Sequence, residues 1–244
     1  RSNQPAVFFD SSGRTFSCDV HTLPSARSKG EPLTGRFNMV AGEQFEYVIM
    51  AKESQKFLRA SEAGYGFVGT CADILSKNKA GKAYLSLPVA AKVLSPVLVN
   101  DIETDRCLAI SNEGRMLLFP LRDLPSLGKG KGNKIINIPS AKAKTREEYV
   151  VALAVVPAGC DVKVLAGKRG MTLKASDLEH YYGERGRRGN KLPRGLQRVD
   201  GVEVLAPDGT VIDSEEDVGV AVDSVAVDTL NIESAPKDDL FSAD

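Results

Sequence analysis

Short runs of alternating apolar and polar residues recur along the chain, and each pair of runs is separated by a turn that contains glycine. In the clearest copy, residues 107–110 and 115–119 flank the turn Ser-Asn-Glu-Gly. Two half-buried runs joined by a few residues that include glycine predict a β-hairpin. The pattern also occurs at 8–16, at 58–68 and more loosely at 164–173. The turn glycines of the four copies are spaced by 51, 50 and 56 positions: Gly13, Gly64, Gly114 and Gly170.

A short connector and one more strand follow the predicted hairpins, and a further strand precedes the next hairpin. The connectors are too short for packed helices and read as single turns at 21–24, 72–75, 122–125 and 176–178. Strands are predicted at 83–87 and 134–138 after connectors, and at 47–51, 93–99 and 150–156 before the next hairpin or its equivalent. About four strands in a unit of about 50 residues is typical of a propeller blade. The sequence therefore predicts an all-β, propeller-like fold with four visible repeats.

A cluster of Lys, Arg and Gly lies about fifteen positions beyond each turn. Glycine lets backbone amides approach a phosphate, while ammonium and guanidinium groups neutralise it. One such cluster is typical of a solvated turn, but four in register with a repeat predict a surface that binds nucleic acid through its phosphates. Charge density ranks the clusters at 129–134 and 185–194 first. The candidate DNA-binding residues are Arg27, Lys29, Lys77, Lys79, Lys82, Lys129, Lys131, Lys134, Arg185, Arg187, Arg188, Lys191 and Arg194.

The net charge of zero conceals a strong asymmetry along the chain. Residues 1–200 contain 31 Lys and Arg against 20 Asp and Glu, a net charge of +11, and residues 201–244 contain 1 against 12, a net charge of −11. We therefore expect a basic domain at 1–205 and an acidic tail at 206–244 that competes with a polyanion for the basic surface. A tail that is merely solvated is the alternative. Residues 201–212 still read as a hairpin with a turn at Pro207-Asp-Gly-Thr. Residues 218–227 could add a strand or stay mobile, and composition alone favours a tail.

Catalytic and metal-binding chemistry finds no support in the sequence. The four cysteines form no Cys-x-x-Cys pair and are expected to be reduced, partly buried thiols. His21 and His180 lie beside connector turns, and the pair Glu147-Glu148 lies in what reads as an exposed linker. No phosphate-binding loop motif, signal-peptide pattern or bilayer-length apolar run is present. We predict no catalytic residue and no metal site.

Long motifs resemble the C-terminal domain of the bacterial topoisomerase IV protein that carries the active-site tyrosine (ParC), a relative of the gyrase A C-terminal domain. They include Ala-Gly-Tyr-Gly-Phe-Val at 63–68, Lys-Gly-Lys-Gly-Asn-Lys-Ile-Ile-Asn-Ile-Pro-Ser at 129–140 and Gly-Glu-Arg-Gly-Arg-Arg-Gly at 183–189, within a resemblance from about residue 4 to about 205. The resemblance implies a β-pinwheel, a propeller-like disc whose blades exchange strands with their neighbours and whose basic rim binds and bends DNA.

The resemblance also implies the partners and the activity. In that family this domain is not catalytic, because the active-site tyrosine lies outside it, and it presents DNA crossings for relaxation of positive supercoils and for decatenation. It implies double-stranded DNA, the rest of the ParC chain and the ATPase protein ParE of a heterotetramer as partners. No cofactor is implied in this domain, whereas Mg and ATP serve the intact holoenzyme. The implied location is the cytoplasm, at the bacterial nucleoid, with no membrane partner.

Two departures from the family pattern affect these expectations. No loop carries intact the Gln-Arg-Arg-Gly-Gly-Lys-Gly box that gyrase needs for tight wrapping, which favours relaxation and decatenation over active supercoiling. The chain also opens inside what resembles the first blade, so that the intact domain could have five blades or the disc could be short by one repeat. A propeller scaffold that binds protein partners is the alternative function. A third alternative, an enzyme in the central channel, would need convergent titratable groups, and the sequence shows no such set.

Overall fold

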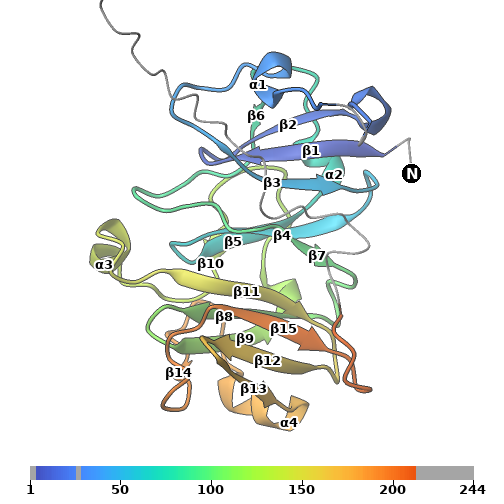
Figure 1. Ribbon diagram of the computed structural model, residues 1–244. Coiled ribbons are helices and arrows are strands. Elements are labelled where there is room, and N and C mark those ends of the chain that lie inside the picture. The colour runs from blue at the N-terminus through green and yellow to red at the C-terminus, as the bar shows by residue number, and fades with distance from the viewer. Residues whose placement is uncertain (1–3, 26–28, 213–244) are drawn as a thin grey trace, which may run out of the picture.

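The fold is a row of four antiparallel β-sheets, seen in a computed structural model that describes residues 4–25 and 29–212 (Figure 1). In sheet order, the first sheet is β3 (Phe45–Met50), β1 (Pro5–Asp10), β2 (Arg14–Asp19) and β6 (Lys82–Ala83), and the second is β10 (Asn133–Lys134), β5 (Tyr65–Thr70), β4 (Lys56–Ser61) and β7 (Val97–Val99). The third is β11 (Val150–Val156), β8 (Arg106–Ser111), β9 (Arg115–Pro120) and β14 (Asn190–Lys191), and the fourth is β13 (Arg169–Leu173), β12 (Asp161–Ala166) and β15 (Gly201–Leu205).

Short helical turns lie between the strands. They are η1 (Val20–Thr22), α1 (Leu33–Arg36), α2 (Cys71–Ile74), η2 (Leu121–Asp123), α3 (Ser140–Lys144), α4 (Ala175–Leu178) and η3 (Glu179–Tyr181). Those near 21–24, 72–75, 122–125 and 176–178 agree with the predicted connectors, whereas the turns at 33–36 and 140–144 were not predicted. Among the described residues, no helix is long and apolar enough to cross a membrane. The predicted all-β, propeller-like fold is confirmed, and so is the hairpin at 201–212, where Leu205 pairs with Val211. Residues 213–244 of the predicted acidic tail lie outside the described residues.

The outermost strand of each four-stranded sheet comes from the following repeat. The short strands β6, β10 and β14 pair with β2, β5 and β9 of the preceding hairpin. Just beyond each short strand, a backbone N–H donates to the carbonyl of the turn glycine of that hairpin. The donors and acceptors are Leu85 to Gly13 at 3.1 Å, Ile135 to Gly64 at 2.7 Å and Leu192 to Gly114 at 2.8 Å. The sheets therefore exchange strands with their neighbours, which is the β-pinwheel arrangement.

Glycine is required at the turns because the crossing segment lies directly against them. Gly13 and Gly64 have φ of +83° and +79°, and a Cβ at Gly64 would lie 2.6 Å from the carbonyl oxygen of Ile136. The prediction for the fourth copy is wrong, because its turn is Gly167-Lys168, between the paired residues Ala166 and Arg169. Gly170 lies within β13, opposite Leu165. No described strand crosses this hairpin, so no neighbouring backbone requires a glycine at the position equivalent to the other three turn glycines.

The core is divided between the sheets, because alternate side chains of each central strand point to opposite neighbours. In β8, Cys107 and Ala109 pack with the second sheet, whereas Leu108 and Ile110 pack with the fourth. Every residue of β8 after Arg106 is consequently buried. Strand β12 of the fourth sheet instead alternates, with Val162 and Val164 buried and Lys163 half-exposed. The outer face of the fourth sheet is therefore polar, as expected for the last sheet of a row, on which no further sheet packs.

Several strands are shorter than predicted. The segments predicted at 83–87 and 134–138 pair as strands only at 82–83 and 133–134, and that predicted at 93–99 only at 97–99. The apolar residues that follow the short strands, such as Tyr84 and Ile135, are buried between sheets. They anchor the crossing segment by burial, and a longer hydrogen-bonded ladder is not formed.

Some turn glycines lie directly beneath the crossing segment of the next repeat. Replacing one of them should destabilise the domain more than replacing a glycine that has a similar positive φ but no neighbouring atoms. Gly64→Ala and Gly159→Ala both place an alanine at φ near +79° and +78°, but nothing lies within 4 Å of a Cβ at position 159. We expect Gly159→Ala to lower the free energy of unfolding by about 1–2 kcal/mol from backbone strain. Gly64→Ala should cost about 1–3 kcal/mol more from the clash. Urea unfolding of the two variants measures the difference, and equal losses would contradict the role of the crossing.

Candidate nucleic-acid interface

Three of the four predicted basic clusters lie on the outer edges of consecutive sheets. We call them rim loops 1, 2 and 3, at residues 76–86, 127–137 and 183–194. Each contains the short strand that completes the preceding sheet, so strand exchange places it there. The fourth cluster, at 27–30, follows the first hairpin and supplies no strand to any described sheet. Its Arg27 lies outside the described residues, and its Lys29 is exposed.

Backbone hydrogen bonds at equivalent positions link the rim loops in series. Asn38 donates to the carbonyl of Lys79 at 2.8 Å, Ser86 to that of Gly130 at 3.0 Å, and Asn137 to that of Arg187 at 2.9 Å. The first bond ties the segment after the cluster at 27–30 to rim loop 1, and the other two join rim loop 1 to rim loop 2 and rim loop 2 to rim loop 3. The basic residues therefore follow one another along a connected backbone, and their order around the edge is set by the fold.

The residue after each turn glycine holds the incoming loop, a role that the sequence analysis did not assign. Arg14 donates from Nη2 to the carbonyls of Ala80 at 2.8 Å and Gly81 at 3.1 Å, and Arg115 donates from Nη1 to that of Gly189 at 3.2 Å. In the second sheet this position is Tyr65, and the Nζ of Lys131 lies 4.2 Å from the centre of its ring. A long side chain recurs directly after each of these turn glycines, and this recurrence is the sequence signal that could have revealed the role.

The lysines of the rim loops are mostly left open to solvent. Within the described part of the chain, seven predicted residues are exposed and have no side-chain hydrogen bond or ion pair: Lys29, Lys77, Lys79, Lys82, Lys129, Lys191 and Arg194. Lys131 is also exposed and stacks on Tyr65, and Lys134 donates from Nζ to Oδ1 of Asn137 at 3.0 Å. A flexible lysine with a free ammonium group can follow a phosphate without a fixed geometry.

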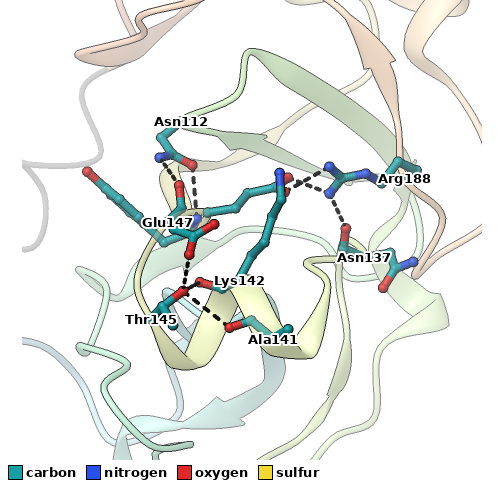
Figure 2. Close-up of polar contacts among 9 residues, drawn as sticks. Asn112, Asn137, Ala141, Lys142, Thr145, Glu147 and Arg188 are labelled. Atoms are coloured by element: carbon teal, nitrogen blue, oxygen red, sulfur yellow. Dashed lines mark hydrogen bonds and ion pairs between the residues drawn. The ribbon is translucent and has the colours of Figure 1, made fainter.

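Three arginines of rim loop 3, unlike its Arg194, are instead engaged within the protein. Arg185 donates from Nη1 to the carbonyl of Lys134 at 2.7 Å, and Arg187 pairs with Glu184 in a largely exposed ion pair. Arg188 forms a two-pronged contact with the carboxylate of Glu148, with 2.8 Å between Nη2 and Oε2, and it also donates to the carbonyl of Asn137. Figure 2 shows Arg188, Asn137 and Lys142 around this contact, beside α3. The bonds of Arg185 and Arg188 fasten rim loop 3 to rim loop 2 and to Glu148 in the segment that follows it.

The expectation that Glu147-Glu148 lies in an exposed linker is wrong for Glu148. The Glu148 side chain has no exposed surface, whereas Glu147 is exposed. Its carboxylate is shared by Arg188 and by Lys142, whose Nζ lies 3.9 Å from Oε2. A buried carboxylate needs such partners to offset its lost hydration. The spacing of 40 residues between Glu148 and Arg188 left no signal in the sequence.

The described residues show little that favours covalent or metal chemistry. Burial raises the pKa of the Cys71 thiol to about 11 and also raises the pKa of Cys107, so both are protonated at neutral pH. All four cysteines are free thiols, and three of them are buried, as expected. Both histidines are exposed beside connector turns. In the described ranges no three His, Cys, Asp or Glu side chains gather closely enough to hold a metal ion.

Comparisons with known proteins agree with this architecture. The family described as "DNA gyrase C-terminal domain, beta-propeller" matches residues 105–157. The ParC-type protein of DNA topoisomerase 4 from Pseudomonas aeruginosa is 56% identical over 207 residues, which cover 85% of this chain and 28% of that protein. Its counterpart from Escherichia coli K12 is 50% identical over 85% of this chain and 27% of its own length. The chain thus spans little more than a quarter of the curated relatives it matches.

Solved structures identify the class and then the family. The gyrase A C-terminal domain is 14% identical with a TM-score of 0.62, over 84% of this chain and 67% of that one, and shares the fold. Strand exchange together with this likeness defines a β-pinwheel domain. The Escherichia coli ParC C-terminal domain is 50% identical with a TM-score of 0.79, over 85% of this chain and 83% of that one. The chain belongs to the family of ParC C-terminal domains, which are part of topoisomerase IV.

Removing each of two neighbouring arginines of rim loop 3 should change the stability of the domain by very different amounts. Arg188→Ala would leave the buried Glu148 without its main partner, and we expect the free energy of unfolding to fall by about 2–3 kcal/mol, since Arg188 is itself partly exposed. Arg187→Ala removes only an exposed ion pair and should change it by less than about 0.5 kcal/mol. Chemical denaturation compares the two variants. A stable Arg188→Ala protein would show that the Glu148 contact does not hold the loop.

Proposed function

We propose that the chain is the DNA-binding and DNA-bending part of a type IIA topoisomerase and has no catalytic role of its own. The single observation that carries this proposal is the series of rim loops. Three basic segments occupy equivalent positions on consecutive sheets, are joined by backbone hydrogen bonds, and expose lysines without partners in the described structure. A duplex that follows this edge would contact phosphates at each sheet in turn and bend as the row of sheets turns.

In this proposal, most of the binding energy comes from contacts between the rim loops and DNA phosphates. Most exposed cationic side chains of the rim loops are lysines. Of the exposed Asn side chains, Asn78 and Asn190 already hydrogen-bond to the backbone, so few amide groups are available for base edges and we infer recognition that is independent of sequence. The proposed partners are double-stranded DNA, the rest of the ParC chain and the ATPase protein ParE, at the nucleoid. In the holoenzyme, which uses Mg and ATP, the domain would present DNA crossings for relaxation of positive supercoils and for decatenation.

Duplex binding should depend steeply on salt, and the lysines of rim loop 2 should contribute to the slope. If four to six phosphates are contacted, log affinity against log salt should have a slope of about −4 to −5. We expect the double variant Lys129→Ala/Lys131→Ala to reduce the magnitude of the slope by about 2, because each lost phosphate contact removes about 0.9. Fluorescence anisotropy of a labelled duplex across a salt series measures both.

The matched control removes two lysines from the opposite end of the same sheet. Lys52 and Lys56 are exposed and lie at or before the start of β4, away from the Gly64 turn where β10 pairs. Lys52→Ala/Lys56→Ala changes the net charge by the same amount and should leave the slope nearly unchanged. Equal losses in both variants would mean that only net charge matters. Weak binding that is flat in salt would overturn the DNA proposal and favour a scaffold for protein partners.

The acidic tail should oppose DNA binding. Residues 213–244 contain 10 Asp and Glu and one Lys, and like charges repel phosphates while competing for the rim lysines. We expect a chain ending at Ile212 to bind the duplex more tightly than the full chain, with the difference largest at low salt. The same anisotropy series measures it. Identical affinities at every salt concentration would exclude an inhibitory role for the tail.

A further inference from the structure

A groove lined in part by apolar side chains runs between the innermost strands of the second, third and fourth sheets. It has a volume of about 810 Å³ and lies between β7, β11 and β15, with Val97, Val151, Leu153, Val202 and Val204 among the residues that line it. All five of these side chains are only half-buried. Each of the five also packs against the edge of a core between sheets, so the groove exposes only part of their apolar surface.

The described part of the chain ends inside this groove. Val211 and Ile212 line it, and Val211 is 50% exposed. The N–H of Ile212 donates to the carbonyl of Val204 at 2.7 Å, and Val211 pairs with Leu205. The pairing is antiparallel, so the chain leaves Ile212 in the direction of the Gly201 end of β15. The last described residues therefore run along the wall of the groove toward that end.

A valine-rich segment follows within reach. Residues 218–227 read Val-Gly-Val-Ala-Val-Asp-Ser-Val-Ala-Val, with valines at every second position from 218 to 222. This alternation is typical of a strand with one apolar face. The six steps from Ile212 to Val218 can span at most about 20 Å, which is close to the length of a five-residue strand. The segment is otherwise surrounded in sequence by carboxylates, so its apolar character is distinctive.

The other apolar surfaces are less suitable for this segment. The outer face of the fourth sheet carries an ion pair between Lys163 and Glu203 and the exposed Thr172, so it is polar. The outer face of the first sheet is apolar, but Phe8 and Phe16 are already buried there beneath neighbouring rings. That face lies at the opposite end of the row of sheets from β15 (Figure 1).

We propose that residues 218–227 of the same chain dock in the groove between β7, β11 and β15. The valines would cover the half-buried valines of β11 and β15, and burial of apolar surface would drive the contact. Docking would hold the acidic residues at 213–217 beside the groove and tether the remaining acidic residues to the domain. The proposal concerns the chain itself and does not depend on DNA binding.

Hydrogen exchange of the full chain tests whether the segment is docked. We expect amides at 218–222 to exchange at least tenfold more slowly than unprotected amides. The double variant Val220→Asp/Val222→Asp should abolish this protection, whereas the matched variant Thr229→Asp/Asn231→Asp, with the same added charge, should preserve it. Unprotected exchange at 218–222 in the unaltered chain would overturn the proposal. Protection that grows with protein concentration would also overturn it, since a second copy would then be the partner.

Disulfide capture tests where the segment lies. Cysteines introduced as Val222→Cys and Val97→Cys place one thiol in the segment and one in the groove, and the control pair is Val222→Cys with Thr172→Cys on the polar outer face. Three native thiols are buried, so they should compete little. We expect bond formation under mild oxidation to be at least tenfold faster with Val97→Cys. Comparable rates for the two pairs, or a faster rate with Thr172→Cys, would overturn docking in the groove.

Discussion

The hydrogen bond from each crossing segment to the turn glycine of the preceding hairpin is the contact on which the rest of the architecture depends. It brings the backbone of one repeat directly against the backbone of another, and only a residue without a Cβ fits there. Because the crossing completes the preceding sheet, no four-stranded sheet is formed by one repeat alone. The sheets are therefore coupled in a row, and apolar side chains of each central strand can be buried on both faces.

The same crossings position the charge of the outer edge. Each basic loop is delivered to the edge of the preceding sheet, and equivalent backbone bonds connect one loop to the next. Arginine and lysine have different roles at this edge because their side chains differ in chemistry. Arg14, Arg115 and Arg188 donate bonds from a planar group and hold loops in place, whereas most rim lysines remain free. The backbone of the rim loops is therefore held in place by hydrogen bonds, while the lysine ammonium groups can adapt their positions.

The fold could largely be predicted from the sequence because its signals are local. A turn glycine with apolar runs on both sides depends only on neighbouring residues, and three of the four turns were placed correctly. The fourth failed because its hairpin has no described crossing, so no clash demands glycine at the equivalent place and the pattern is loose. The short crossing strands were predicted too long because Tyr84 and Ile135 are apolar for burial between sheets, which a sequence pattern does not distinguish from strand pairing.

The sequence by itself determined the repeat, the hairpins, the concentration of basic residues beyond each turn and the opposite charges of the two parts of the chain. These properties follow from the order of residues over short spans. The tertiary structure alone decided which sheet each crossing strand joins, which basic residues stay free, and that Glu148 is buried beneath Arg188. Those outcomes depend on residues 40 or more positions apart, such as Glu148 and Arg188 or Arg14 and Ala80, whose proximity is created only by packing of the sheets.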